Sequence, residues 1–169
     1  MENSGIERHK IMKVTSPIQV RLAVPEDAPE IVAFNQAMAL ETEGKALEDE
    51  VIHAGVRRIF EEPNLGFYVV AEEAEKLVGT LMVTKEWSDW RNGVFWWIQS
   101  VYVIRECRGR GVYRAMSRFV QEQAHANPEV CGFRLYVEKN NHIAQKTYRA
   151  LGMTETHYLL YEEELQRPV

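Results

Sequence analysis

The chain has 169 residues, of which 46% are hydrophobic and 27% are charged, the balance of one globular domain with a sizeable core. Its net charge of -5 argues against a nucleic-acid surface, which needs an excess of Lys and Arg. Two cysteines and no long apolar run exclude a disulfide framework and a membrane span. We therefore predict a cytoplasmic protein with one domain over residues 18–169, a flexible arm over residues 1–17, and neither nucleic-acid nor membrane partners.

Hydrophobic periodicity and turn residues predict the element order β-α-α-β-β-β-α-β-α-β, a mixed sheet flanked by helices. The predicted strands are residues 18–23, 67–72, 77–85, 95–103, 131–138 and 154–162. The predicted helices are residues 25–40, 47–61, 109–126 and 141–151. Residues 41–45 are expected to break the first helix, and residues 87–93 to connect two strands through the hairpin signal Asn92-Gly93.

A basic turn, RGRGVY at residues 108–113, joins the uncharged strand 95–103 to the helix that follows. Glycine permits positive φ and lets backbone N–H groups come close to an anion. The helix start adds unpaired N–H donors and a partial charge of about +0.5, and Arg108 and Arg110 add forked, charged donors. The turn predicts a pyrophosphate site, and a solvated basic turn is the alternative. Neither the P-loop nor the dinucleotide glycine pattern is present, so these two kinds of phosphate site are excluded.

These residues resemble a motif of the GCN5-related N-acetyltransferase (GNAT) family. The family motif Q/R-x-x-G-x-G/A, which binds the pyrophosphate of acetyl-coenzyme A, is similar to the residues at Arg108, Gly111 and Tyr113, after a strand that ends in Val101-Tyr102-Val103. A second family signature is similar to Asn141, Ala144, Tyr148, Gly152 and Met153. The resemblance covers residues 18–162. Tyr113 departs from it, because the family has Gly or Ala there, and Arg105 replaces a common proline.

The resemblance implies an α/β (α+β) fold with a mixed, mostly antiparallel twisted sheet, and an N-acetyltransferase that uses acetyl-CoA as its acyl donor. By the same resemblance, Tyr148 is the general acid for the departing thiolate, and the amine attacks directly in a ternary complex because no activated cysteine is evident. The residues implied to bind the coenzyme are Ser100, Val101, Val103, Arg108, Gly109, Arg110, Gly111, Val112, Tyr113 and Asn141.

The general base and the acceptor site are less defined. Diamine acetyltransferases of the family have Glu where this chain has Gln99, which cannot take a proton. Glu41 is our choice of base, with Glu43, Glu86 and Asp89 as the other candidates. Gln99, Glu43, Trp87 and Trp90 are the predicted acceptor contacts, because an aromatic slot with carboxylates suits an alkylammonium ion.

The expected acceptor is a small polyamine-like or amino-acid-like amine. No metal is predicted, because no ligand cluster with metal spacing is present. Family members often pair through sheet edges, so a homodimer is a further expectation. Two alternatives stay open: a protein N-terminal or lysine acetyltransferase, and a non-catalytic acyl-CoA binding or sensing module, which the missing strand carboxylate and Tyr113 suggest.

Overall fold

The computed structural model describes residues 16–165, which form two compact units, one ending at Leu135 and one beginning at Tyr136. Most of the predicted N-terminal arm, residues 1–15, lies outside the described residues. The single domain predicted over residues 18–169 stays a prediction. None of the helices in the described part of the chain is long and apolar enough to span a membrane.

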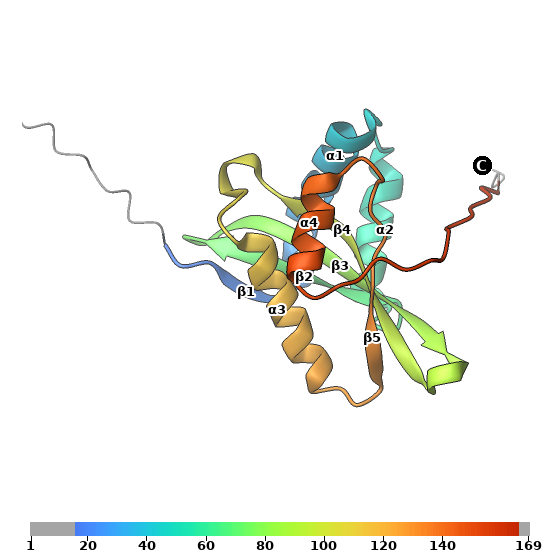
Figure 1. The fold of residues 1–169 in the computed structure, drawn as a ribbon. Helices are drawn as coiled ribbons and strands as arrows, with labels where there is room; N and C mark the ends of the chain where they lie inside the picture. The colour runs from blue at the N-terminus through green and yellow to red at the C-terminus, as the bar shows by residue number, and fades with distance from the viewer. Residues whose placement is uncertain (1–15, 166–169) are drawn as a thin grey trace, which may run out of the picture. The chain divides into compact units, whose positions relative to one another are not determined.

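The first unit is built on a five-stranded sheet in the order β1-β2-β3-β4-β5 (Figure 1). Its strands are β1 (Gln19–Leu22), β2 (Gly66–Glu73), β3 (Lys76–Ser88), β4 (Gly93–Val103) and β5 (Val130–Arg134). Strands β1 to β4 pair antiparallel, and β5 pairs parallel with β4. The prediction of a mixed, mostly antiparallel sheet is confirmed.

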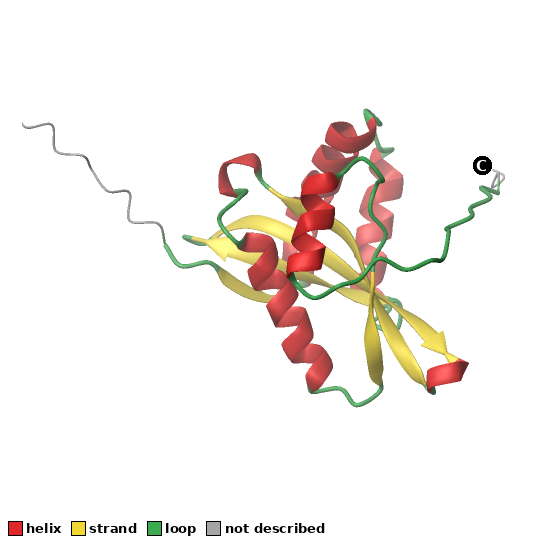
Figure 2. Cartoon of the chain, viewed as in Figure 1, coloured by secondary structure: helices red, strands yellow, loops and turns green. Residues whose placement is uncertain are grey.

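Helices cover both faces of this sheet (Figure 2). Helices α1 (Ala28–Glu43) and α2 (Asp49–Glu61) pack on one face, and α3 (Val112–His125) packs on the other. Helix α3 buries residues four apart, so one stripe faces the sheet. The core beneath α3 contains Val69, Leu81, Val83, Trp96, Ile98, Val112, Met116 and Val120, and the core beneath α1 and α2 contains Ile31, Val32, Val56, Tyr68 and Val70.

The second unit contains helix α4 (His142–Ala150) and extended chain. The predicted last strand, residues 154–162, is wrong: residues 153–165 adopt no strand. Alternating apolar and polar residues favour a strand, but a strand forms only with a hydrogen-bonded neighbour, and the apolar side chains there, such as Leu159 and Tyr161, are exposed. The predicted strand 131–138 also ends early, at Arg134, where its pairing with β4 stops.

Several predicted boundaries are shifted by residues in left-handed conformation. Helix α1 continues to Glu43 and ends at Gly44 (φ 63°), so Glu41 and Glu43 lie in its last turn and not after it. Helix α3 begins at Val112, because Gly109 (φ 72°) and Gly111 (φ 83°) cannot belong to a right-handed helix. The β3–β4 connection is shorter than predicted, and Trp87 belongs to β3.

Candidate active site

Strand β4 loses its β5 neighbour halfway along its length. The parallel pairing ends at Trp97 and Arg134, although β4 continues to Val103. Just beyond this point, Ser100 has φ 50°, and the register with β3 shifts, so that β4 bulges. A bulge with a residue in left-handed conformation is a feature that often lies beside an active site. The second half of β4 thus has a distorted backbone and no β5 partner on one side.

The glycine turn follows directly after this open stretch. The 3-10 segment η3 (Arg105–Cys107) leads from β4 into the turn, and Gly111, in left-handed conformation, is the N-cap of α3. The Gly111 carbonyl accepts a helical hydrogen bond from the Ala115 N–H at 2.9 Å. The first N–H groups of a helix have no intrahelical acceptor, and together with the helix dipole they attract an anion. The strand, turn and helix therefore form a main-chain site suited to a phosphate group.

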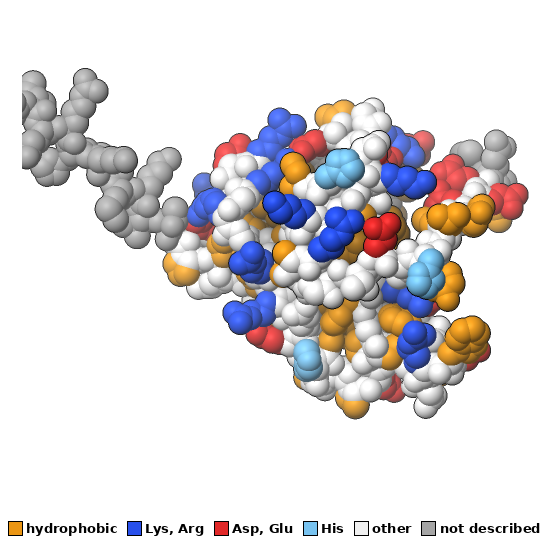
Figure 3. Space-filling view, in the orientation of Figure 1, with side chains coloured by type: hydrophobic (Ala, Val, Ile, Leu, Met, Phe, Trp, Pro, Cys, Tyr) orange, Lys and Arg blue, Asp and Glu red, His pale blue; other side chains and the backbone are white. Residues whose placement is uncertain are grey.

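The two arginines of the turn are engaged by carboxylates from elsewhere in the first unit. Arg108 donates through Nη2 to Glu41 Oε2 at 3.0 Å, through Nη1 to the other Glu41 oxygen, and through Nε to the Val103 carbonyl at 2.8 Å. Arg110 donates through Nη1 to Glu73 Oε2 at 3.0 Å. Figure 3 shows Lys and Arg side chains gathered over the start of α3 and the loop before it.

Glu41 receives a second arginine. Arg105 donates through Nε to Glu41 Oε2 at 3.2 Å. Hydrogen bonds from Arg108 are the largest cause, and with a weaker contribution from Arg105 they outweigh the opposing effect of burial and lower the pKa of Glu41 to about 2. A carboxylate with this pKa accepts a proton poorly at neutral pH. The environment of Glu41 therefore suits an ion-pairing role better than that of a general base.

Gln99 lies on the α1 face of the sheet, in a polar and aromatic strip that the sequence did not reveal. Its amide donates to the Thr84 hydroxyl. Farther along, Glu86 accepts from Trp97 Nε1 and, at 2.7 Å, from Arg134 Nη1. Burial alone would raise the pKa of Glu86, but the hydrogen bonds from Trp97 and Arg134 lower it below its usual range. The strip arises from the pairing of β3 with β4. In the sequence, its only signal is that Trp97 and Gln99 are two residues apart in one strand and that Glu86 lies in the strand before it.

The two tryptophans among the predicted acceptor contacts lie apart from Gln99. Trp87 pairs with Val94, which packs in the core beneath α3, so Trp87 and Gln99 face opposite sides of the sheet. Val94 and Gln99 are five positions apart on β4, which is roughly 17 Å along the strand. Trp90 lies at the hairpin tip and is 88% exposed. The first unit therefore does not bring Trp87, Trp90 and Gln99 into one slot.

Asn141 and Tyr148 belong to the second unit. The Asn141 side chain caps α4, accepting from the Ala144 N–H at 3.0 Å. Gly152, with φ 89°, follows the helix and donates to the Arg149 carbonyl at 3.0 Å. Burial raises the pKa of the Tyr148 phenol above its ordinary value of 10. At neutral pH this phenol keeps its proton, as a general acid must.

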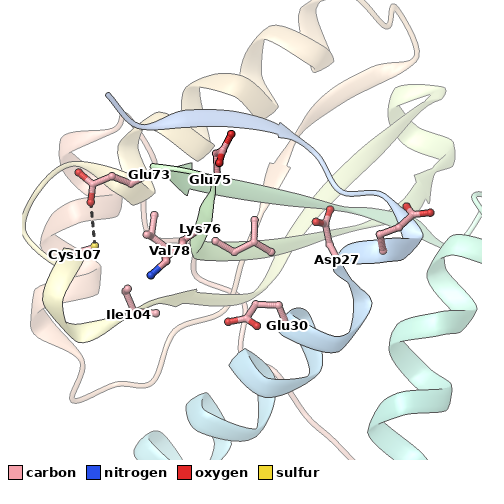
Figure 4. Close-up of a pocket in the computed structure, with 10 residues that line it drawn as sticks. Asp27, Glu30, Glu73, Glu75, Lys76, Val78, Ile104 and Cys107 are labelled. Atoms are coloured by element: carbon pink, nitrogen blue, oxygen red, sulfur yellow. Dashed lines mark hydrogen bonds between the residues drawn. The ribbon is translucent and has the colours of Figure 1, made fainter. Parts of the chain in front are cut away.

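A separate acidic cavity of about 660 Å³ lies between the start of α1 and the β2–β3 turn (Figure 4). It contains none of the predicted site residues. Two of its carboxylates already have arginine partners: Asp27 accepts from Arg21 at 2.7 Å, and Glu73 accepts from Arg110. Among residues 16–165, no group of three or more His, Cys, Asp or Glu side chains could hold a metal ion.

Comparison with known proteins agrees with this geometry. The model of the acetyltransferase (GNAT) family matches residues 31–153, so the chain belongs to the GNAT acetyltransferase family. A structure described as a "possible acetyltransferase from Clostridium difficile 630" is 41% identical, with 89% of this chain and 99% of that chain covered and a TM-score of 0.82. No curated protein matches the sequence significantly.

Two more distant structures share the fold. The ribosomal-protein-alanine N-acetyltransferase from Brucella melitensis biovar Abortus 2308 is 13% identical, with 89% of this chain and 100% of that chain covered and a TM-score of 0.72. AAC(6')-Iy, in complex with the bisubstrate analog CoA-S-monomethyl-acetylneamine, is 16% identical, with the same coverages of 89% and 100% and a TM-score of 0.72. At these identities the likeness supports the fold alone.

Proposed function

We propose that this protein transfers the acetyl group of acetyl-CoA to a primary amine by direct attack in a ternary complex. One observation carries the proposal: β4 loses its β5 partner beyond Trp97, bulges at Ser100, and then leads into a left-handed glycine turn at the N-terminus of α3. An open strand edge offers hydrogen bonds to the amides of an extended thioester. The helix start beside it offers N–H groups to the two phosphates.

The residues proposed for the coenzyme divide into two groups. Backbone groups of Ser100, Val101 and Val103 would meet the pantetheine amides and the oxygen on which negative charge develops. The turn at residues 108–113 would hold the pyrophosphate, mainly through main chain, because Arg108 and Arg110 are already paired with Glu41 and Glu73. Asn141 remains a proposed coenzyme contact, although its side chain also caps α4.

Tyr148 is the proposed general acid. The neutral amine nitrogen attacks the thioester carbonyl carbon and the carbon–sulfur bond breaks. The thiolate takes the phenol proton, the new amide nitrogen releases a proton to solvent, and the Tyr148 phenolate regains a proton from solvent. A phenol with a pKa above 10 remains protonated at neutral pH, and a thiolate with a pKa of about 8.5 accepts its proton at modest cost.

The proposed acceptor is a small amine, either polyamine-like or amino-acid-like, with Gln99 and Glu43 among its contacts. The excess of acidic residues supports a cationic acceptor, although the Glu86 carboxylate in the strip beside Gln99 is already paired with Arg134. Since Trp87 lies on the opposite face from Gln99, we do not combine the two in one slot. A cytoplasmic location and a homodimer also remain proposals.

An acyl-CoA sensing module is the second candidate function. Gln99 cannot accept a proton. Glu41 is paired with two arginines, and its pKa is lowered to about 2. Neither residue is therefore suited to deprotonate an ammonium ion. A thiol-release assay with acetyl-CoA and a panel of polyamines, amino acids and peptides separates the candidates. We expect thiol release with at least one small amine. Coenzyme binding by calorimetry without release on any amine would favour the sensor.

A further inference from the structure

The ion pair between Glu41 and Arg108 joins two segments that are 67 residues apart in the chain. Glu41 lies in the last turn of α1, and Arg108 is the first residue of the glycine turn. Three donor nitrogens of Arg108 are used, two by the Glu41 carboxylate and one by the Val103 carbonyl at the end of β4. The arginine therefore connects the turn to a strand and to a helix at the same time.

The direction of the Arg108 side chain separates it from the start of α3. Its guanidinium carbon lies 5.5 Å from the centre of the Tyr102 ring, and that ring packs against Phe34 of α1 at 5.4 Å. The neighbours of Tyr102, which are Val101 and Val103, pack instead with the core beneath α3. The guanidinium thus lies on the α1 side of the sheet, whereas the N-terminus of α3 lies on the other.

Helix α1 has its own reason to hold these arginines. Glu41 and Glu43 both lie in its last turn, where the helix dipole is negative and carboxylates are unfavourable. Arg105 and Arg108 both reach Glu41 and offset this repulsion. The Glu41 side chain is 28% exposed, so solvent screens the pair only in part. A bidentate carboxylate–arginine pair is also geometrically specific.

We propose that Glu41 is a positioning residue, which holds Arg108 so that the 104–111 loop presents its backbone N–H groups to the coenzyme. In this role Arg108 braces the loop and does not bind phosphate. This ion pair also links the end of α1 to the coenzyme loop. The inference rests on the proposed function, because it takes this loop as the coenzyme site.

If Arg108 instead bound phosphate, neutralising Glu41 would change the coenzyme affinity in the opposite direction. If Arg108 bound phosphate and Glu41 competed with it, neutralising Glu41 would free the guanidinium and tighten coenzyme binding. If Glu41 braces Arg108, neutralising either residue loosens the loop and weakens coenzyme binding. Because the two act as one unit, the double variant should be no weaker than the weaker single variant.

The test measures the Kd of coenzyme A by calorimetry for the wild type, Glu41→Gln, Arg108→Gln and the double variant. We expect each single variant to raise Kd about 3- to 10-fold, as a partly exposed charged pair would, and the double variant to match the weaker single one. Tighter binding by Glu41→Gln, or additive effects in the double variant, would overturn the inference. Thermal unfolding of each variant checks that it is folded.

Glu106→Gln is the matched control. Glu106 lies in η3, beside Arg105, and its exposed side chain has no ion pair or hydrogen bond among residues 16–165. The substitution removes the same charge from the same loop, so it reports any general electrostatic effect on an anionic ligand. We expect its Kd to stay within about twofold of the wild type, because solvent screens an exposed charge. A rise equal to that of Glu41→Gln would overturn the inference.

Steady-state kinetics distinguish a brace from a base. For Glu41→Gln we expect the KM for acetyl-CoA to rise while kcat at saturating acetyl-CoA stays within about twofold, whereas loss of a general base lowers kcat about 100-fold or more. A fall of that size would overturn the inference and leave the proposed function standing. If the wild type bound no coenzyme A, both the proposed function and the inference would fail.

Discussion

The same substitution at two glycines should change the stability of this protein in opposite directions. At Gly111, φ is +83° and, apart from its neighbours along the chain, no atom of residues 16–165 lies within 4 Å of an added Cβ, so alanine costs energy through the backbone and not through a clash. An L-residue in left-handed conformation costs about 1–2 kcal/mol. Gly55, in the interior of α2, also has open space around an added Cβ, but its backbone is helical. There alanine should gain about 0.5–1 kcal/mol.

Thermal unfolding followed by circular dichroism measures both effects. For a chain of this size, 1 kcal/mol shifts Tm by roughly 2–4 °C. We therefore expect Gly111→Ala to lower Tm by about 2–8 °C and Gly55→Ala to raise it by about 1–4 °C.

Calorimetry with coenzyme A then separates stability from function. Gly111→Ala should weaken binding, because Gly111 caps α3 at the proposed pyrophosphate site, and Gly111→Val should weaken it further because valine is β-branched. Gly55→Ala should leave Kd unchanged. A Gly111→Ala variant with wild-type Tm and wild-type Kd would refute the reasoning, because the turn would then need neither positive φ nor the close approach of an anion.

Three further predictions follow from single sites. Tyr148→Phe should lower kcat at least about 10-fold, as loss of a general acid does, and should leave the coenzyme Kd nearly unchanged. An unaltered kcat would exclude Tyr148 as the acid. Glu75→Gly should raise the unfolding free energy, measured by urea titration, by about 0.5–1 kcal/mol. Ala74 and Glu75 both have positive φ in the β2–β3 turn, and glycine removes the backbone strain at position 75. A loss of stability would contradict this prediction. The pKa of Glu41 falls from 4.5 to about 2 on folding, so its carboxylate stabilises the fold above its unfolded pKa and loses this effect as the pH falls toward 2. The stability difference between the wild type and Glu41→Gln should shrink over that range, and a constant difference would argue against the ion pair.

Local sequence signals predict the structure correctly where interactions between near neighbours in the chain determine it. The uncharged run before the glycine turn forms β4, and residues four apart place α3 on the sheet. Asn141 begins α4 by capping it through its own side chain. Such features depend on neighbours within one or two turns of chain, so spacing and residue type suffice to predict them. The predicted strand at residues 154–162 is wrong, because alternating apolar and polar residues do not show whether a neighbouring strand is available for hydrogen bonding.

Residue types and their spacing are enough to predict the fold class, the strand–turn–helix order and the glycines of the proposed pyrophosphate site. Three features depend on the folded chain: β4 separates from β5 beyond Trp97, Trp87 and Gln99 face opposite sides of the sheet, and Glu41 meets Arg108. The physical reason is that strand register and ion pairing join residues far apart in the chain. Spacing along the sequence carries no information about which distant partner a charged side chain will meet.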